Sequence, residues 1–262
     1  MLKKMLISPA HYVRNIFDTP KTSAALNFGS LIHTMVLEPG SFHTVYDIWP
    51  VDVRPNSKEG KAFAQSRPNR NLITETEFAQ ARRMASKILE RTYRGRPLSR
   101  FLEEGEPEVT FFFTDPDCGV ECRVRHDLWH PEILFDLKTT RHPHVRQFLH
   151  AAVEMHYDLQ AYMYGYAEAL YSGRSRALPF VFVAAENTMP HSVSMLTAAE
   201  NFIANGKAKY IHALSRYAAC TQVDYWPDLG VEQEIDIEPW QVFRPELLEL
   251  PSIETEASLI VG

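Results

Sequence analysis

The order of apolar and polar residues predicts two helices before the middle of the chain. Residues 27–38 place apolar side chains three and four positions apart and stop before Pro39, as a helix does. Residues 74–93 open with Thr74 and Glu77 at the spacing of a capping box and continue with a helical apolar stripe.

The stretches around these helices are expected to be connections. Residues 1–27 contain Pro9 and Pro20 and are predicted to be loop-like, whereas residues 44–50 alternate in the manner of a strand. Residues 53–71 are polar and rich in Lys and Arg, which predicts a loop with one short helix. This stretch is either a solvated connection or a surface that faces nucleic acid, and the sequence leaves both interpretations open.

Short apolar or alternating runs predict the strands of a central sheet. They lie at residues 108–114, 120–127, 133–138, 179–185 and 192–196. A tight turn through Pro116 and Gly119 joins the first two. The run 179–185 is apolar throughout, which is typical of a strand that is buried on both faces.

Two further helices are predicted after the Asp-x-Lys strand. Residues 141–147 are expected to form a loop, residues 155–171 a helix, and residues 198–220 another helix. The polar stripe of the first of these helices consists of His156, Gln160 and Tyr164. The pattern as a whole predicts a mixed α/β (α+β) fold, in which a sheet of about five strands is flanked by helices.

The first candidates for a functional site are Asp127, Asp136 and Lys138. Because side chains on a strand alternate, Asp136 and Lys138 point to one side while Leu137 points into the core. If the two strands are neighbours, the carboxylate of Asp127 can meet that of Asp136. Burying two carboxylates beside an ammonium costs free energy that a divalent cation would offset. An Asp-x-Lys strand is also common as a solvated edge or a simple ion pair, so other residues must decide.

Additional polar residues are predicted near the same strands. One face of the strand 120–127 carries Glu121, Arg123, Arg125 and Asp127, which places a cleft on that side. Glu108, at the start of the preceding strand, either reaches this cleft or is an ordinary exposed residue. His33, beside the apolar face of the early helix, is either a core or surface histidine or a metal ligand.

The combination of residue types indicates phosphodiester chemistry. Carboxylate oxygens with one imidazole suit Mg²⁺ or Mn²⁺, hard cations that also accept phosphate oxygens as ligands. One such ion polarises a phosphoryl oxygen and activates water, and a second can stabilise the leaving oxygen. Lys138 beside the ion can orient or deprotonate water and neutralise charge that develops on phosphorus.

Composition restricts the compartment and the class of protein. No apolar run in the 262 residues approaches the roughly 18–20 residues needed to span a bilayer, so we expect no membrane segment. The three cysteines are an odd number without a Cys-x-x-Cys pair, which favours a reducing cytoplasm over a disulfide framework.

The net charge of −6 is unevenly distributed. Residues 229–262 contain eight acidic residues and one basic residue, a balance of −7, which leaves +1 for residues 1–228. We therefore predict a single domain at 1–228 and an acidic tail at 229–262 that is partly disordered or packs at an interface. A nearly neutral body offers little long-range steering of DNA, so any contact must use a local groove.

The sequence resembles the PD-(D/E)XK nucleases of the RecB and lambda-exonuclease type, and is most similar to the phage-type RecE exonuclease (exonuclease VIII) domain. The shared order is Gly-x-x-x-His, Asp, Asp-x-Lys and Gln-x-x-x-Tyr, within residues 8–228. The similar blocks are FDTP (17–20), FGSLIHTMVLEP (28–39), DPDCGVECRVRHD (115–127), FDLKTT (135–140), YDLQAYMYGY (157–166), FVFVAAE (180–186) and DYWP (224–227). His126 stands where the motif usually has proline.

The resemblance implies a restriction-endonuclease-like core and a role for individual residues. The expected metal ligands are His33, Asp127, Asp136, the backbone carbonyl of Leu137 and, for a second ion, Glu108. The expected catalytic residues are Lys138, Asp136, Asp127 and Gln160. The residues expected to contact DNA are Gln160, Tyr164, Arg123, Arg125, Thr139 and Lys21, and Arg14 is a further candidate for the contact with a 5′-phosphate.

The activity implied by the resemblance is that of an exonuclease with one or two Mg²⁺ ions, replaceable by Mn²⁺, which degrades linear duplex DNA from the 5′ end. Its expected partners are duplex ends, a single-strand annealing protein of the RecT type and further copies of itself in a ring of three or four, in the cytoplasm of a bacterial or phage-infected cell. Two alternatives are a single-strand or structure-selective nuclease on the same fold and a non-catalytic DNA-binding or assembly module. The presence together of Asp127, Asp136, Lys138 and Gln160 disfavours the last, because a module without catalysis has no use for buried charges.

Overall fold

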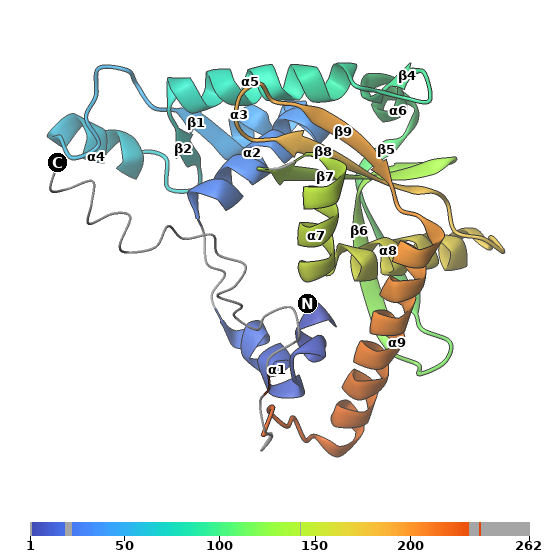
Figure 1. The fold of residues 1–262 in the computed structure, drawn as a ribbon. Helices are drawn as coiled ribbons and strands as arrows, with labels where there is room; N and C mark the ends of the chain where they lie inside the picture. The colour runs from blue at the N-terminus through green and yellow to red at the C-terminus, as the bar shows by residue number, and fades with distance from the viewer. Residues whose placement is uncertain (1, 19–22, 142, 231–235, 237–262) are drawn as a thin grey trace, which may run out of the picture. The chain divides into compact units, whose positions relative to one another are not determined.

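The computed structural model of the chain is centred on one five-stranded mixed sheet (Figure 1). Its strands, in spatial as in chain order, are β5 (Glu106–Thr114), β6 (Glu121–His130), β7 (Ile133–Thr140), β8 (Phe180–Glu186) and β9 (Val193–Thr197). Neighbouring strands are antiparallel except β7 and β8, which are parallel. The predicted mixed sheet of about five strands is therefore confirmed.

The structure describes residues 2–18, 23–141, 143–230 and 236. It divides into two compact units, Met1–Asp228 and Leu229–Gly262. The first unit contains all the helices and strands reported below. The predicted acidic tail falls almost wholly outside the described residues. In the described ranges, no helix combines the length and apolar character needed to cross a membrane.

Helices cover both faces of the sheet, as Figure 1 shows. On one face lie α2 (Ala24–Leu37), α5 (Glu75–Glu90) and α6 (Leu98–Glu104), whose apolar residues pack against Phe135, Leu137 and Val181. On the other face α7 (Val145–Glu154), α8 (Tyr157–Ser172) and α9 (Glu200–Val223) cover Leu134 and Phe182. A parallel strand pair needs a long crossover, which α7 and α8 supply between β7 and β8. Because both faces are covered, β8 is almost entirely buried, as its apolar sequence predicted.

Smaller elements complete the first unit. They are η1 (Leu2–Leu6), α1 (Pro9–Phe17), η2 (Pro39–Ser41), α3 (Phe42–Val45), β1 (Tyr46–Ile48), α4 (Lys58–Gln65), β2 (Asn71–Ile73), β3 (Thr92–Tyr93) and β4 (Arg96–Pro97). β1 pairs in parallel with β2, and β3 with β4 in antiparallel fashion. The strand predicted over residues 44–50 exists over Tyr46–Ile48 as β1, the predicted short helix exists as α4, and the predicted capping box opens α5.

The prediction of a loop over residues 1–27 is wrong. Ser8 caps α1, accepting a hydrogen bond from the backbone N–H of His11. Pro9 occupies the first turn of this helix, where a missing N–H removes no helical hydrogen bond. Met5 of η1 is fully buried and packs with Ala213 and Cys220 of α9, so the N-terminal segment is part of the folded body.

The connection after β7 also differs from the prediction. The sequence was expected to continue as a loop to residue 147 and to start a helix near Met155, but α7 already begins at Val145. Its buried side chains are Phe148 and Ala152. His156, predicted to lie on the helix, instead interrupts it with a φ of 59° in the left-handed region. Non-glycine residues seldom adopt this conformation, and no sequence signal at a histidine announces it.

Candidate functional site

The site begins where β6 and β7 separate. The two strands pair only over three positions, from Leu128 opposite Phe135 to His130 opposite Ile133. Asp127 precedes this paired stretch, and its Oδ2 accepts a hydrogen bond of 2.7 Å from the backbone N–H of Leu137. The carboxylate therefore accepts the hydrogen bond that the backbone of a neighbouring strand would otherwise accept from β7, and this bond fixes its position.

His33 reaches the same place from α2. Its Nε2 lies 2.9 Å from the carbonyl oxygen of Leu137, and its Nδ1 lies 3.8 Å from Oδ2 of Asp127. Because a carbonyl only accepts, Nε2 carries the proton of the neutral ring, and Nδ1 directs a lone pair toward the carboxylate. Burial, the largest influence, lowers the pKa of His33 and favours this neutral form. Nδ1 of His33 and Oδ2 of Asp127 thus direct lone pairs toward each other, and a cation between them could be coordinated by both.

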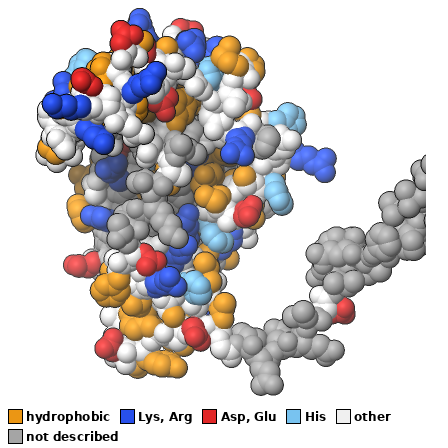
Figure 2. All heavy atoms as spheres, turned by 90° about the vertical axis from the view of Figure 1, so that its left-hand side faces the viewer, with side chains coloured by type: hydrophobic (Ala, Val, Ile, Leu, Met, Phe, Trp, Pro, Cys, Tyr) orange, Lys and Arg blue, Asp and Glu red, His pale blue; other side chains and the backbone are white. Residues whose placement is uncertain are grey.

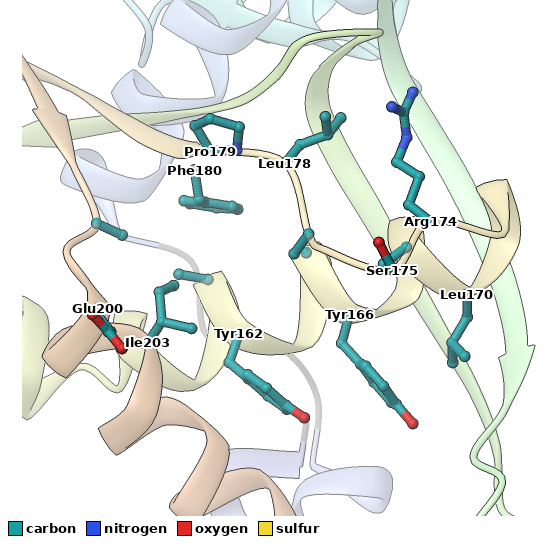
Figure 3. A pocket seen from close by; sticks show the side chains of 15 residues that line it. Tyr162, Tyr166, Leu170, Arg174, Ser175, Leu178, Pro179, Phe180, Glu200 and Ile203 are labelled. Carbon is teal, nitrogen blue, oxygen red and sulfur yellow. The ribbon is translucent and has the colours of Figure 1, made fainter.

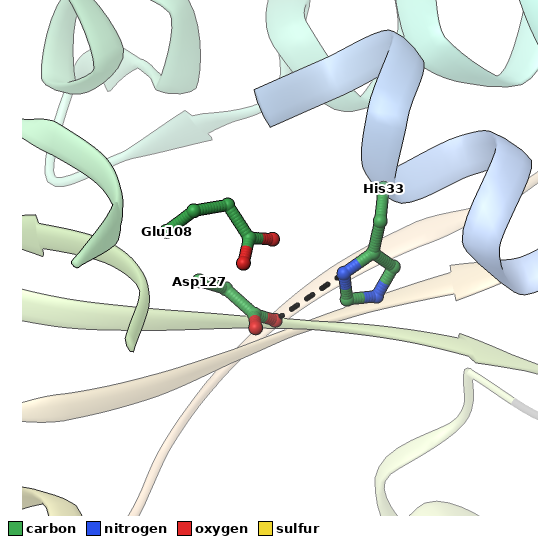
Figure 4. A group of neighbouring side chains, drawn as sticks. All are labelled: His33, Glu108 and Asp127. Atoms are coloured by element: carbon green, nitrogen blue, oxygen red, sulfur yellow. Dashed lines mark ion pairs between the residues drawn. The ribbon is translucent and has the colours of Figure 1, made fainter. Parts of the chain in front are cut away.

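Glu108 completes a group of three possible ligands. It lies on β5 between Pro107 and Val109, which pair with Leu128 and His126 on either side of Asp127. Its φ of 57° is in the left-handed region, a conformation that costs a non-glycine residue about 1 kcal/mol or more. Ligand atoms of His33, Glu108 and Asp127 all lie within 4.8 Å of one another (Figure 4). The donor set of two carboxylates and one neutral imidazole fits a divalent cation such as Mg²⁺ or Mn²⁺.

Asp136 and Lys138 lie beside this group, toward α7 and α8. Asp136 is 1% exposed; its Oδ1 accepts a 2.5 Å hydrogen bond from Nε2 of Gln160 on α8, and its Oδ2 forms an ion pair with Lys138. The ammonium of Lys138 lies 4.9 Å from the ring centre of Tyr157. Leu137 packs in the opposite core, as strand alternation predicted. In this arrangement both oxygens of Asp136 face Gln160 and Lys138, so Asp136 is outside the three-ligand group.

Burial shifts the ionisation of the charged residues. It raises the pKa of Asp127 to about 6 and that of Asp136 to about 6, with Lys138 opposing both shifts. The charge of Asp127 adds to the shift of Asp136, so the two carboxylates repel each other. Burial alone would lower the pKa of Lys138, but Asp136 and Asp127 outweigh it and raise that pKa above the usual value. Lys138 is therefore a firmly held ammonium ion.

These shifts predict a pH-dependent response to metal. The folded protein holds protons on Asp127 and Asp136 up to about pH 6, whereas the unfolded chain releases them near pH 4. A cation held by Asp127 must displace the proton of this carboxylate below about pH 6, so the stabilisation it gives is full above that pH and is lost as the pH falls through 6. We expect Mn²⁺ to raise Tm clearly at about pH 7.5 and hardly at about pH 5. An equal rise at both values, measured by thermal denaturation with and without EDTA, would contradict this assignment.

The residues expected to contact DNA differ in their surroundings. Tyr164 packs inward, with its ring 5.2 Å from that of His126, and burial raises its pKa to about 12. Arg123 is exposed on β6, whereas Arg125 forms a 2.6 Å ion pair with Glu108. Thr139 lies against α2, since its Oγ1 would be 3.1 Å from a Cβ placed on Gly29. Arg14 pairs with Asp18 in an exposed position, and Lys21 lies outside the described residues.

Two residues near the site were given no role by the sequence. Tyr157, beneath Lys138, lies three positions before Gln160, so both fall on one side of α8. That spacing was a usable signal. His126 replaces the expected proline and is 1% exposed between Phe111 and Tyr164. Burial lowers its pKa to about 4, so it is a neutral filler of the core under Asp127.

An apolar hollow lies elsewhere. A pocket of about 510 Å³ opens between α8, the start of β8 and the first turn of α9, and Tyr162, Tyr166, Arg174 and Glu200 are among its lining residues (Figure 3). None of the predicted ligands or catalytic residues lines it. The charged group on the sheet, rather than this pocket, therefore marks the candidate site.

The molecular surface has mixed charge. On the face drawn in Figure 2, Lys and Arg side chains occur between acidic and apolar ones instead of covering the surface. This mixture agrees with the small net charge of residues 1–228. Attraction of a polyanion must therefore depend on local groups of cations.

Comparisons with known proteins agree with this geometry. Residues 1–235 match the profile of a family described as “PDDEXK-like domain of unknown function (DUF3799)”. No curated protein matches the chain significantly. Among solved structures, the crystal structure of a “Putative exonuclease” from Eubacterium rectale is similar, with a TM-score of 0.54 and 14% sequence identity, covering 86% of this chain and 80% of that one. At this identity the likeness shows a shared fold.

Proposed function

We propose that this chain, which belongs to the family of PDDEXK-like domains described above, hydrolyses phosphodiester bonds of DNA as a metal-dependent nuclease. The membership confirms the predicted relationship to the PD-(D/E)XK superfamily and the restriction-endonuclease-like core. Because the family description gives no function, the activity rests on the site itself. The observation that carries it is the convergence of His33, Glu108 and Asp127 within 4.8 Å beside the Asp136–Lys138 pair.

Each residue has a role that its position supports. His33, Glu108 and Asp127 would hold the cation, which when bound polarises the phosphoryl oxygen and activates water. The backbone of Leu137 orients two of these ligands. Its N–H donates a hydrogen bond to the carboxylate of Asp127, and its carbonyl oxygen accepts one from the ring of His33. The carbonyl that the sequence assigned to the metal thus has a second use, as the acceptor that fixes the His33 ring.

Asp136, Gln160 and Lys138 form the second half of the proposed site. Gln160 and Lys138 both bond Asp136, and this fixes the carboxylate and the ammonium relative to each other. Lys138 is charged, so it is suited to neutralise negative charge that develops on phosphorus and less suited to remove a proton from water. Rotation of Asp136 away from Lys138 would add its carboxylate to the ligand group.

The finer parts of the proposal concern substrate and partners. We assign Mg²⁺, or Mn²⁺ in its place, as the cation, with one or two ions in the site, and linear duplex DNA ends as the substrate, degraded from 5′ to 3′. The resulting single strand would pass to an annealing protein of the RecT type, in a bacterial or phage-infected cytoplasm, with the nuclease assembled as a ring of three or four copies. The order of the motifs supports these assignments, through the resemblance to phage-type exonucleases.

Strand polarity is tested with linear duplex DNA labelled at either the 5′ or the 3′ end and digested with Mg²⁺. We expect early release of labelled mononucleotides from the 5′ end and no cleavage of a closed circular duplex. Early release from the 3′ end would reverse the polarity. Cleavage of flaps or single strands alone would replace the duplex exonuclease with a structure-selective or single-strand nuclease.

A further inference from the structure

We infer that the junction of α7 and α8, formed by Met155 and His156, binds a backbone phosphate of the DNA strand next to the proposed catalytic centre. This inference rests on the proposed function and adds a substrate contact that the motif residues do not include. Its cations come from Lys3 on η1 and Lys209 on α9, with Lys138 of the proposed site nearby.

The two lysines converge on the junction from opposite ends of the sequence. Nζ of Lys3 lies 3.5 Å from the carbonyl oxygen of Met155, and Nζ of Lys209 lies 3.5 Å from that of Val153. α9 comes close enough to hold Lys209 there because Gly206 abuts the backbone of Asp158, whose carbonyl oxygen leaves no room for a Cβ at that position. The packing of three separate elements therefore places these ammonium groups at the end of α7.

Within the described ranges, His156 has a ring nitrogen without a hydrogen-bond partner at the same junction. Its backbone is left-handed, with a φ of 59°, which costs free energy. Such strained conformations cluster at functional sites. Nδ1 of His156 is shielded from solvent and has no hydrogen-bond partner in the described part of the chain. It also stands at the N-cap of α8 without making a side-chain cap. An anionic oxygen at the junction could accept from Nδ1 and face the positive end of this 16-residue helix.

Among the described residues, carboxylates balance two of the three lysines near the junction but not Lys3. Asp158 is paired with Lys209 at 2.7 Å, and Asp136 is paired with Lys138. Lys3 has no carboxylate partner among the described residues. Its pKa is lowered by burial first, and then by the charges of Lys4 and Lys138. An ammonium without a carboxylate partner, close to two paired lysines in a body of net charge +1, is a local feature that an anion would stabilise.

The junction is connected to the proposed catalytic centre through one residue. Tyr157 follows His156 directly and lies beneath the ammonium of Lys138. A strand whose scissile phosphate meets Lys138 would thus present a neighbouring phosphate to Lys3 and His156. The occupant we assign is a phosphodiester of a DNA strand, because the junction adjoins the proposed hydrolytic site, where a bound strand places its phosphates next to one another.

The test compares Lys3→Gln with Lys207→Gln, an exposed lysine that lies two residues before Lys209 on α9. Binding of a fluorescent duplex with a single-stranded end is measured in Ca²⁺ over a range of salt concentrations. We expect Lys3→Gln to weaken binding about threefold and to reduce the slope of log K against log salt by about 0.7–0.9, the value of one phosphate contact. In Mg²⁺ its KM should rise while kcat stays within about twofold, because the contact is made before and during reaction. Lys207→Gln should match the wild type.

His156→Asn is a second variant, since asparagine tolerates the left-handed conformation and lacks the imidazole. We expect the same direction of change in binding, with Tm close to that of the wild type. Equal affinity and equal salt slope for the wild type, Lys3→Gln and Lys207→Gln would overturn the site. A response of Tm to inorganic phosphate that requires Lys3, with DNA binding unaffected by Lys3→Gln, would overturn it in favour of a free-phosphate site.

The outcomes also separate this inference from the proposed function. If the wild type cleaves DNA and Lys3→Gln binds and cleaves equally well, the junction site is wrong and the nuclease stands. If the wild type binds with a Lys3-dependent slope but hydrolyses nothing in Mg²⁺ or Mn²⁺, the site stands and the nuclease is wrong. A wild type that neither binds nor cleaves contradicts both.

Discussion

Replacement of Lys138 by alanine is expected to reduce DNA hydrolysis about a thousandfold, the effect of removing one positioned group that stabilises transition-state charge. The ammonium is held by Asp136 and by the ring of Tyr157, and the surrounding carboxylates keep it charged. No other described cation is bonded to Asp136, so no neighbour takes over its role. The measurement is the initial rate of nucleotide release in Mg²⁺, with saturating DNA.

The control for this variant must separate lost chemistry from lost structure. Without Lys138, the buried Asp136 loses its counter-ion and is expected to take up a proton, which limits the destabilisation. Circular dichroism and Tm should therefore show a folded protein. Lys207→Ala removes an exposed lysine and should retain the full rate. A Lys138→Ala rate within about tenfold of the wild type would exclude Lys138 from the catalytic step.

The second large effect is expected on metal binding. Asp127→Asn removes the negative charge that faces Nδ1 of His33, while the amide oxygen can still accept from the N–H of Leu137. The change therefore tests the charge with little disturbance of the backbone. We expect the affinity for Mn²⁺ to fall at least a hundredfold, or about 2.7 kcal/mol, and hydrolysis to fall with it.

Calorimetric titration with Mn²⁺ measures this loss directly. Asp117→Asn is the matched control, because Asp117 is an exposed carboxylate on the turn before the same strand. Its affinity and rate should equal those of the wild type. If Asp127→Asn binds Mn²⁺ as tightly as Asp117→Asn does, the cation is held by other residues and the assigned ligand group is wrong.

Local patterns sufficed for the part of the site that lies on neighbouring strands. Alternation placed Asp136 and Lys138 on one side of β7 and Leu137 on the other, and the structure has this arrangement. The apolar run of β8 and the capping box of α5 were equally readable, because each reflects interactions within a few residues. The approach of His33 to Asp127 came from the family resemblance, since residues so far apart in sequence share no local pattern.

Other features depend on packing that the sequence does not display. Glu108 enters the ligand group through a left-handed backbone at a position that was predicted as ordinary strand. The hydrogen bonds of Leu137 to Asp127 and His33 arise because β6 and β7 separate after three pairs. The break at His156, which divides α7 from α8, has no glycine or proline to mark it. These features are determined by tertiary packing, and they involve the residues on which the proposed chemistry depends.

The nuclease assignment is tested most directly by incubating the wild-type protein with linear duplex DNA and Mg²⁺ and measuring acid-soluble nucleotides. The account predicts steady release that stops with EDTA, resumes when Mg²⁺ or Mn²⁺ is restored, and is absent in Lys138→Ala. No release with either cation, from a folded protein whose Tm nevertheless rises on adding Mn²⁺, would contradict the assignment and leave a metal-binding module without nuclease activity.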